Sequence, residues 1–259
     1  MEGDQIGRFS GKVVLVTGAA SGIGEAAARR FGHEGAILVL ADQNAEGLNK
    51  VAGSIEAADT LAVVADLSDA ERCQDVVAQA VQRFGRLDVL INNAGKDHLG
   101  RVDEGDIDDF STIIETDLYG VFYMTRFALP HLRESRGSIV NVSSVSGLGG
   151  DWNHSFYCAA KGAVTNFTRA VALDEARNGV RVNAVNPSLV YTPFTAGMQE
   201  QPELVAKFEE RIPMGRGAKP DDISGVIAFL ASEDAHFVTG VNLPVDGGLS
   251  ASNGQPKLN

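Results

Sequence analysis

Basic residues are scarce in this sequence, and their scarcity excludes one large class of partners. The chain has 22 lysines and arginines against 34 aspartates and glutamates, which gives a formal net charge of −12 at pH 7. No run of about five or six basic residues offsets this excess, so the phosphate backbone of a nucleic acid would be repelled. We therefore expect no nucleic-acid partner.

Cysteines and long apolar runs are also rare. Cys73 and Cys158 are the two cysteines, which is too few for a disulfide framework or a zinc site, so we expect no metal. No apolar run approaches the roughly eighteen residues that a membrane span needs. The segment from Met1 to Arg8 carries two acidic residues where a signal peptide would have basic and then apolar residues. These absences predict a cytoplasmic protein with no membrane partner.

The chain does have enough apolar material for one folded domain. Of its 259 residues, 44% are hydrophobic and 22% are charged, and no internal repeat or linker divides it. Surface scaling for a chain of this size indicates that folding buries roughly 70% of its surface. We therefore expect residues 1–259 to form a single domain.

Short apolar runs alternate with segments of helical periodicity along the chain. The runs show little polar alternation, as strands buried on both faces do, and they lie at Lys12 to Val16, Ala36 to Ala41, Leu61 to Ala65, Asp88 to Asn92, Ser138 to Ser143, Val180 to Asn186 and Val241 to Asp246. The helical segments are Gly22 to Gly32, Ala45 to Ala57, Asp69 to Phe84, Ile107 to Arg133, Ser155 to Asn178 and Pro220 to Ser232. This alternation predicts an α/β fold with a doubly wound parallel sheet, the Rossmann fold, whose ligands bind at the carboxyl ends of the strands.

The alternation is interrupted from Ser188 to Lys219, a stretch too long for an ordinary loop. It contains several prolines and glycines and the apolar residues Leu189, Phe194, Met198, Leu204, Val205 and Phe208. Because these apolar side chains need a surface to cover, we interpret the insertion, about 188–219, as a lid over the substrate site.

A glycine-rich turn follows the first predicted strand and opens the first predicted helix. It contains Gly18, Ser21, Gly22, Ile23 and Gly24. Glycines let the backbone turn tightly and approach a pyrophosphate, while the helix N-terminus supplies free N–H groups and positive potential. The position of the turn between strand and helix predicts a nucleotide site.

Asp42 closes the second predicted strand and indicates which nucleotide binds. Its carboxylate can accept hydrogen bonds from both hydroxyls of an adenosine ribose and would repel a 2′-phosphate. Its neighbours are Ala41 and Gln43, and neither the turn nor this position carries a lysine or arginine. The predicted cofactor is therefore NAD and not NADP.

Further motifs extend the pattern over almost the whole chain. Asp66 follows the third strand, Asn92-Asn93-Ala94-Gly95 follows the fourth, Ser144 ends the fifth, and Tyr157 precedes Lys161 by four residues. Together with the glycine-rich turn, these motifs resemble the short-chain dehydrogenase/reductase family. The sequence Asp246-Gly247-Gly248 matches the C-terminal signature of that family.

The resemblance implies further contacts with the cofactor. Asp66 and Leu67 would contact the adenine, and Asn93 would contact the adjacent ribose. Gly95 is also a predicted cofactor-binding residue. Tyr157 and Lys161 would contact the nicotinamide side, and the nicotinamide carboxamide would be held by Pro187, Val190 and Thr192. The chain departs from the family at Ser188, where a glycine usually follows the proline.

Tyr157 and Lys161 also have a physical reason to act together. Four residues apart on a helix, they share one face, which continues through Val164 and points inward. An ammonium about 5 Å from the phenol, at an effective dielectric of ~20, would lower the pKa of Tyr157 from ~10 to about 7.5. Tyr157 would then exchange a proton with the substrate oxygen while hydride moves at carbon. Family spacing selects Ser144, rather than Ser143, as the residue that would hold this oxygen.

Asp117 is the exception in the catalytic pattern. It falls on the inward apolar stripe of the segment from Ile107, and a buried carboxylate needs a partner. The family usually has an asparagine here, which links through water to the active-site lysine. We therefore place Asp117 with the catalytic residues, with pairing to a purely structural group as the alternative.

The substrate side is less defined by sequence. Candidate lining residues are Asp97, His98, Ser146 to Leu148, Asp151, Trp152, Leu189 and Phe194, of which Ser146 and Trp152 are predicted substrate contacts besides Ser144 and Tyr157. The segments Val145 to Trp152 and Tyr157 to Val164, with Asp117 and the tail Gly254 to Lys257, resemble one group in the family, the bacterial acetoin reductases or meso-2,3-butanediol dehydrogenases. This resemblance implies an NAD-dependent oxidoreductase for small vicinal diols and hydroxyketones.

Two other functions remain as alternatives. The first is a reductase of another ketone, such as a 3-oxoacyl, steroid or sugar derivative. The second is a nucleotide-binding protein without catalysis, since one fold hosts many functions. His154 and Asp151 lie near the serines, but no Gly-x-Ser-x-Gly motif supports a hydrolase triad.

A homotetramer is predicted from the resemblance. Family members usually pair through two long helices, here Ile107 to Arg133 and Ser155 to Asn178. Their outer faces carry more apolar side chains than one side can bury, among them Phe122, Phe127, Val164 and Phe167. The polar tail from Ser250 to Asn259 would reach across such an interface.

Overall fold

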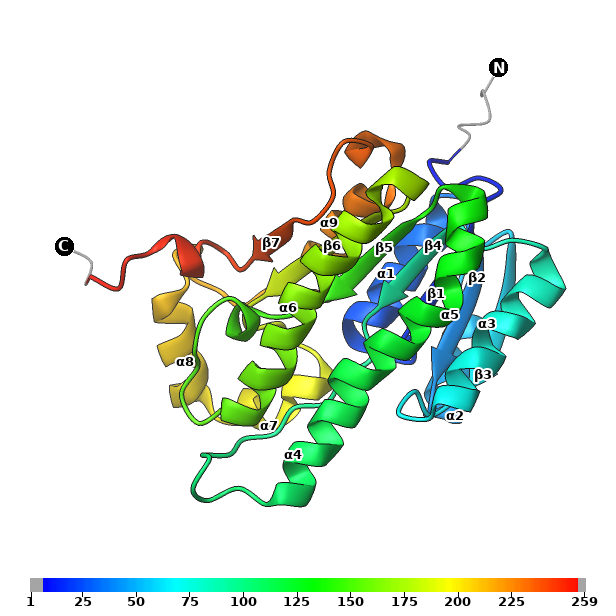
Figure 1. Cartoon of the computed structure of the whole chain (residues 1–259). Helices are drawn as coiled ribbons and strands as arrows, with labels where there is room; N and C mark the ends of the chain where they lie inside the picture. The colour runs from blue at the N-terminus through cyan, green and yellow to red at the C-terminus, as the bar shows by residue number, and fades with distance from the viewer. Residues whose placement is uncertain (1–6, 256–259) are drawn as a thin grey trace.

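The computed structural model describes residues 7–255 and contains one seven-stranded sheet (Figure 1). Its strands are β1 (Val13–Thr17), β2 (Ile37–Asp42), β3 (Asp59–Val64), β4 (Val89–Asn92), β5 (Ser138–Val142), β6 (Arg181–Pro187) and β7 (Asn242–Val245). All pairings are parallel and the order is β3-β2-β1-β4-β5-β6-β7. The direction of winding reverses between β1 and β4, where a doubly wound sheet binds its ligand.

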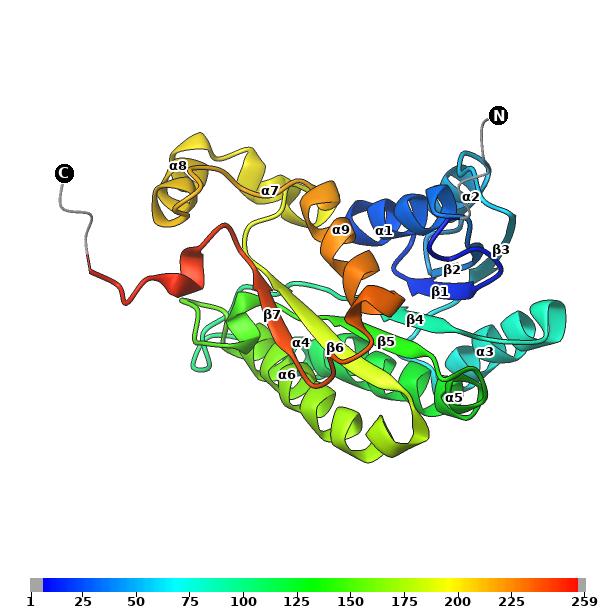
Figure 2. The same ribbon diagram turned by 90° about the horizontal axis from the view of Figure 1, so that it is seen from above.

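Helices cover both faces of the sheet (Figure 2). One face carries α1 (Gly22–His33), α2 (Ala45–Ala52) and α9 (Pro220–Ala231), and the other carries α3 (Ala70–Phe84), α5 (Gly120–Ser135) and α6 (Ser155–Glu175). Alternate residues of β1 serve the two layers: Val14 and Val16 belong to the first core, while Val13 and Leu15 belong to the second. Strands buried on both faces explain the continuous apolar runs in the sequence, and the predicted Rossmann fold is confirmed.

The long helix predicted from Ile107 to Arg133 has an irregular middle. It consists of α4 (Ile107–Ile114), a π-helical turn η1 (Glu115–Tyr119) and α5. A π-turn inserts an extra residue into the helical repeat and commonly marks a functional position. Here it contains the buried Asp117.

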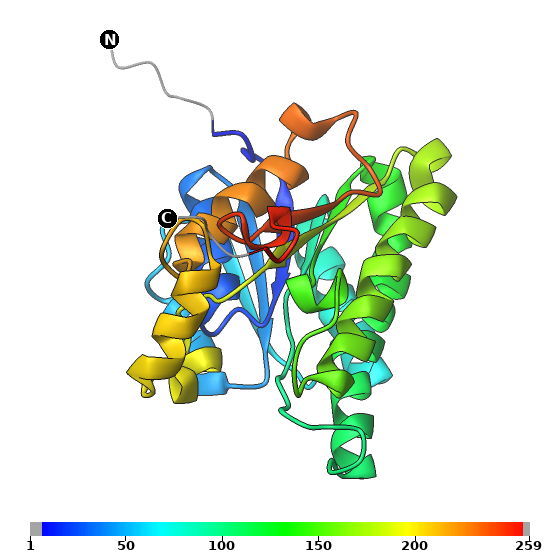
Figure 3. The same cartoon turned by 90° about the vertical axis from the view of Figure 1, so that its left-hand side faces the viewer.

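The insertion after β6 contains the 3₁₀ turn η4 (Pro193–Thr195) and the helices α7 (Ala196–Gln199) and α8 (Pro202–Arg211). Its two ends are joined by a parallel bridge between Val190 and Ala218. Figure 3 shows α7 and α8 (yellow) on one side of the carboxyl ends of the strands and the loop before α4 (green) on the other. The segment predicted to be a lid therefore contains helices, and its two ends pair with each other.

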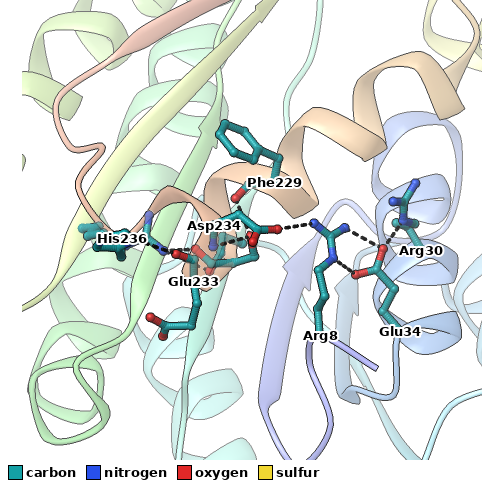
Figure 4. Close-up of polar contacts among 10 residues, drawn as sticks. Arg8, Arg30, Glu34, Phe229, Glu233, Asp234 and His236 are labelled. Atoms are coloured by element: carbon teal, nitrogen blue, oxygen red, sulfur yellow. Dashed lines mark hydrogen bonds and ion pairs between the residues drawn. The ribbon is translucent and has the colours of Figure 1, made fainter. Parts of the chain in front are cut away.

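The amino edge of the sheet is held by an ionic cluster (Figure 4). Arg8 donates to both carboxylate oxygens of Glu34, at the end of α1, with distances of 2.7 Å, and to Asp234 at 3.2 Å. Arg30 also pairs with Glu34. The cluster joins the segment before β1 to the end of α1 and to Asp234. It lies at the edge of the sheet opposite the predicted site.

Residues 7–255 contain neither a membrane-spanning helix nor a metal-binding cluster. No helix there is long and apolar enough to cross a membrane. No group of three or more histidine, cysteine or acidic side chains gathers there in a way that could hold a metal ion.

Candidate active site

The turn after β1 has the geometry that its glycines predict. Gly18 and Gly22 adopt positive φ angles of 62° and 59°, which favour glycine. A Cβ atom on Gly24 would lie 2.1 Å from the carbonyl oxygen of Gly18 and 2.5 Å from the side chain of Asn93. Glycines at these positions therefore keep the N-terminus of α1 open toward the end of β1.

Side chains from neighbouring strands hold this turn in place. Asp42 accepts a hydrogen bond from the Ala20 N–H at 3.0 Å and one from Asn44 at 2.9 Å. The Asn93 amide donates to the carbonyl oxygens of Thr17 at 3.0 Å and Gly18 at 3.1 Å. These hydrogen bonds connect the carboxyl ends of β1, β2 and β4 at the glycine-rich turn.

A cavity of about 300 Å³ opens at this point. Most of the predicted site residues line it, from both the cofactor and the catalytic sets: Gly18, Ser21, Gly22, Ile23, Asp42, Asn93, Gly95, Ser144, Tyr157, Lys161, Pro187, Val190 and Thr192. Phe194 of the insertion after β6 also lines it. The cavity lies at the carboxyl ends of β1, β4, β5 and β6, where the fold places a ligand.

The other predicted residues lie outside this lining: Gly24, Asp66, Leu67, Asp117, Ser146 and Trp152. Gly24 packs behind the turn. The carboxylate of Asp66 accepts hydrogen bonds from the N–H and hydroxyl of Ser68, and Leu67 is buried. Their proposed contacts with adenine remain predictions.

Trp152 does not enter the cavity. Trp152 is 91% exposed and lies in the turn before α6. It lies outside the cavity lining, and its contact with substrate stays a prediction.

Asp117 and Lys161 form a buried ion pair behind the cavity wall. The Lys161 ammonium lies 3.0 Å from Oδ2 of Asp117 and donates to the carbonyl oxygen of Val142 at 3.3 Å. The other oxygen of Asp117 accepts the N–H of Lys96 at 2.7 Å. A Cβ on Gly95 would lie 2.9 Å from Asp117 Oδ2, so glycine is needed there. Asp117 thus has the partner that its inward position required.

Tyr157 lies over this pair. The Lys161 ammonium is 5.5 Å from the centre of the Tyr157 ring, and Val164, Thr168 and Val171, farther along the same face of α6, are buried. Ser144 lies two residues after the end of β5, and its hydroxyl oxygen accepts the N–H of Ser146 at 3.1 Å. The two serines are thus connected through the backbone turn η2 (Val145–Gly147).

The expected lowering of the Tyr157 pKa to about 7.5 is wrong for this chain. Burial raises the pKa of Tyr157, and the opposing effect of Lys161 is weakened by the carboxylate of Asp117. Burial also raises the pKa of Asp117, and it outweighs the charge of Lys161, which lowers this pKa. Burial lowers the pKa of Lys161, but Asp117 and Tyr157 outweigh this and raise it overall. The charge of Lys161 alone would lower the pKa of Tyr157, but the loss of water around the phenol outweighs it.

Sequence reasoning missed Thr195, which lines the cavity. Its hydroxyl donates to the carbonyl oxygen of Val190 at 2.7 Å and accepts the N–H of Thr192 at 3.2 Å. The spacing from Thr192, with Pro193 after it, is a helix-start signal that could have identified this residue.

The fold and the catalytic geometry define a class of protein, and comparisons with known proteins agree. The family model described as enoyl-(acyl carrier protein) reductase matches residues 18–250. A meso-2,3-butanediol dehydrogenase from Serratia marcescens is 53% identical over 251 residues, which cover 97% of this chain and 99% of that protein. This chain belongs to the short-chain dehydrogenase/reductase family and is an oxidoreductase.

Solved structures support the same assignment. Levodione reductase superposes with a TM-score of 0.91 at 36% identity, covering 94% of this chain and 99% of that chain. A 3-ketoacyl-(acyl-carrier-protein) reductase from Brucella melitensis, in complex with NADH, superposes with a TM-score of 0.87 at 38% identity, covering 93% and 99%. The family uses nicotinamide dinucleotides, and the open glycine-rich turn fits such a cofactor.

Proposed function

We propose that this enzyme interconverts small vicinal diols and the corresponding hydroxyketones with NAD, with 2,3-butanediol and acetoin as the best substrates. The observation that carries the proposal is the cavity in which Ser144, Tyr157 and Lys161 meet the glycine-rich turn. The substrate class is supported by the relative from Serratia marcescens. The net charge of −12 also disfavours anionic substrates.

Each catalytic residue has a distinct task in this proposal. When bound, the nicotinamide ring supplies the carbon that accepts or gives the hydride, and its oxidised form carries a positive charge. Ser144 holds the substrate oxygen, and Tyr157 takes the proton from an alcohol or returns it to a ketone. Lys161 stabilises the ionised phenol and would hold the nicotinamide ribose, while Asp117 fixes the position of the ammonium. The Asp117 pair thus sets the charge that Tyr157 experiences.

The substrate class is tested with a panel of alcohols and ketones. We expect kcat/KM to be highest for 2,3-butanediol and acetoin, and lower for 2-butanol, a steroid alcohol, a sugar and a 3-oxoacyl thioester. If a steroid or a thioester exceeds 2,3-butanediol, the enzyme is a reductase of another ketone. Cofactor binding without turnover of any member of the panel indicates a non-catalytic nucleotide-binding protein.

We expect NAD to be preferred over NADP because the carboxylate of Asp42 lines the cofactor cavity. A 2′-phosphate about 4 Å from this carboxylate would be repelled by up to about 4 kcal/mol at an effective dielectric of ~20. Solvent screens part of this, so the expected preference in kcat/KM is roughly 100-fold. Steady-state kinetics with both cofactors measure it.

The double variant Asp42→Ala with Gln43→Arg should reverse this preference. Gln43→Arg alone is the matched control, since it adds the positive charge and keeps the repelling carboxylate. Nearly equal kcat/KM values for NAD and NADP in the unmodified enzyme would contradict the assignment.

We also propose that the enzyme is a homotetramer that pairs partly through α5 and α6. A groove of about 470 Å³ lies on their outer side and is lined by Phe122, Thr125, Arg126, Phe127, Leu129, Pro130, Arg133, Phe167 and Val171. Phe122 is 42% exposed, and such an apolar face is typical of an interface. Val164 does not belong to it: it is fully buried, because its position on α6 faces the sheet.

Light scattering in solution should give about four times the 27.3 kDa chain mass, as family resemblance and the α5–α6 groove suggest. Phe122→Glu should reduce that mass because it places a charge in the groove. A monomer mass for the unmodified enzyme would contradict the proposal. The tail from Ser250 to Asn259 is predicted to reach across the interface, and its residues 256–259 lie outside the described residues.

We propose that the enzyme is cytoplasmic. Cys73 and Cys158 are free thiols. The Cys73 thiol donates to the carbonyl oxygen of Leu67 at 3.3 Å, and burial raises the pKa of Cys73 to about 12. Cysteines that stay free thiols suit a reducing compartment.

A further inference from the structure

A continuous series of polar contacts begins at Ser144 and leads away from the cofactor. The N–H of Ser146 donates to the Ser144 hydroxyl oxygen at 3.1 Å, and the Ser146 hydroxyl donates to Asp151 Oδ2 at 3.2 Å. Nδ1 of His154 lies 3.9 Å from that same oxygen, and Nε2 of His154 lies 3.5 Å from Asp97 Oδ1. We call Ser146, Asp151, His154 and Asp97 the polar chain.

The polar chain joins segments that are distant in sequence. Asp97 belongs to the loop after β4, whereas Asp151 and His154 belong to the turn before α6. The two segments also meet through their backbones, since the N–H of Gly100 donates to the carbonyl oxygen of Asn153 at 2.7 Å. The Ser155 hydroxyl donates to Gly100 at 3.0 Å. His154 is therefore at a junction between two loops at the carboxyl edge of the sheet.

This junction lies against the catalytic tyrosine. The rings of His154 and Tyr157 pack edge to face with centroids 6.1 Å apart. Phe194 of the lid packs against the same tyrosine, at 6.5 Å. His154 thus supports Tyr157 from the loop side and reaches Ser144 through the polar chain.

The surroundings of His154 favour its charged form. The contact with Asp97 raises the pKa of His154 more than burial lowers it. The carbonyl oxygen of Trp152 and the carboxylate of Asp151 also raise this pKa, which reaches about 9. The titratable groups that face the ring are Asp97, Asp151 and Tyr157. His154 is therefore an imidazolium at neutral pH and becomes neutral only above about pH 9.

We propose that His154 is a positioning residue for substrate: as an imidazolium between Asp97 and Asp151, it fixes the two loops and the support of Ser144. The polar chain ends at the group that holds the substrate oxygen, and it does not contact the glycine-rich turn. Loss of the His154 charge should therefore weaken substrate binding and leave cofactor binding unchanged. The choice of substrate for the test rests on the proposed function.

The first test compares His154→Gln with the unmodified enzyme in acetoin reduction by NADH. At pH 7.5 we expect KM for acetoin to rise about tenfold, with kcat and the Kd for NADH within about threefold. In the unmodified enzyme KM should rise between pH 8 and about 10, and in the variant it should be flat. The matched control is His236→Gln, since His236 contacts the carbonyl oxygen of Glu233 at the opposite edge of the sheet (Figure 4).

The second test needs no substrate. Trp152 is the only tryptophan, and its carbonyl oxygen lies 2.9 Å from Nδ1 of His154. Its fluorescence should titrate near pH 9 in the unmodified enzyme and in His236→Gln, and this transition should be absent in His154→Gln. Tyrosine ionisation is common to all three proteins and is removed by comparing them.

The outcomes separate the two proposals. An absent transition in the unmodified enzyme, or a KM that is equal in His154→Gln and the unmodified enzyme, overturns the role of His154. If acetoin and 2,3-butanediol are not turned over, the proposed function fails. KM is then measured with the best ketone of the panel, and the fluorescence titration stands unchanged.

Discussion

Tyr157→Phe is expected to lower kcat for alcohol oxidation by about 10³-fold, while the Kd for NADH stays within about threefold of the unmodified value. The phenol hydroxyl is the group placed to exchange the proton, and Phe keeps the ring that packs between His154 and Phe194. The loss should therefore appear in turnover and not in folding or cofactor binding. Stopped-flow turnover and NADH fluorescence titration measure the two quantities.

Two further variants define this result. Tyr119→Phe is the matched control, because Tyr119 is 44% exposed on the π-turn and does not line the cavity, so it should keep full activity. Lys161→Ala should reduce both turnover and NADH affinity, since one ammonium serves the phenol and the ribose in the proposed mechanism. Substantial activity in Tyr157→Phe would exclude Tyr157 as the proton-transfer residue.

Patterns that depend on local geometry could be predicted from the sequence. Apolar runs buried on both faces gave the strands, and the spacing of Tyr157 and Lys161 put both on the cavity wall. The inward position of Asp117 followed from the apolar stripe around it, and the structure places it 3.0 Å from the Lys161 ammonium. In each case a short repeat in the chain decides the direction of a side chain.

Properties that depend on packing between distant segments could not be predicted in this way. The Tyr157 pKa is raised because its surroundings remove it from water, and no spacing rule measures that burial. Trp152 is exposed in the turn before α6 and lies outside the cavity lining, which its local sequence does not indicate. The contact of His154 with Asp97 joins loops after β4 and before α6, so neither local sequence indicates it.

Asp117→Asn is expected to shift the pH dependence of alcohol oxidation to lower pH by about one unit, or about 1.4 kcal/mol of differential interaction. The geometry favours an ionised Asp117, because Oδ2 faces an ammonium at 3.0 Å and Oδ1 accepts an N–H at 2.7 Å. Burial raises the pKa of Tyr157 most, and the negative charge of Asp117 raises it further, whereas the charge of Lys161 lowers it. Removing the charge of Asp117 leaves the charge of Lys161 unopposed, so the phenol ionises at lower pH.

The same substitution should reduce stability. Asn keeps an acceptor for the Lys96 N–H, but it leaves the Lys161 ammonium without an anionic partner. Complete loss of one partner of a buried ion pair costs roughly 3–5 kcal/mol, and the retained hydrogen bond reduces this to about 2 kcal/mol. Denaturant unfolding measures the loss, and Asp109→Asn, at a half-exposed carboxylate on α4, is the control.

The two measurements on Asp117→Asn distinguish charge from structure. A shifted pH profile with a moderate loss of stability means that the carboxylate is ionised and acts on Tyr157 through Lys161. An unchanged profile with the same loss means that Asp117 is protonated and donates a hydrogen bond, as an amide would. A variant that does not fold means that the π-turn itself depends on the ion pair, because Asp117 connects η1 both to the loop at Lys96 and to α6 at Lys161. The pH profile thus measures how far the buried carboxylate of Asp117 shifts the pKa of Tyr157.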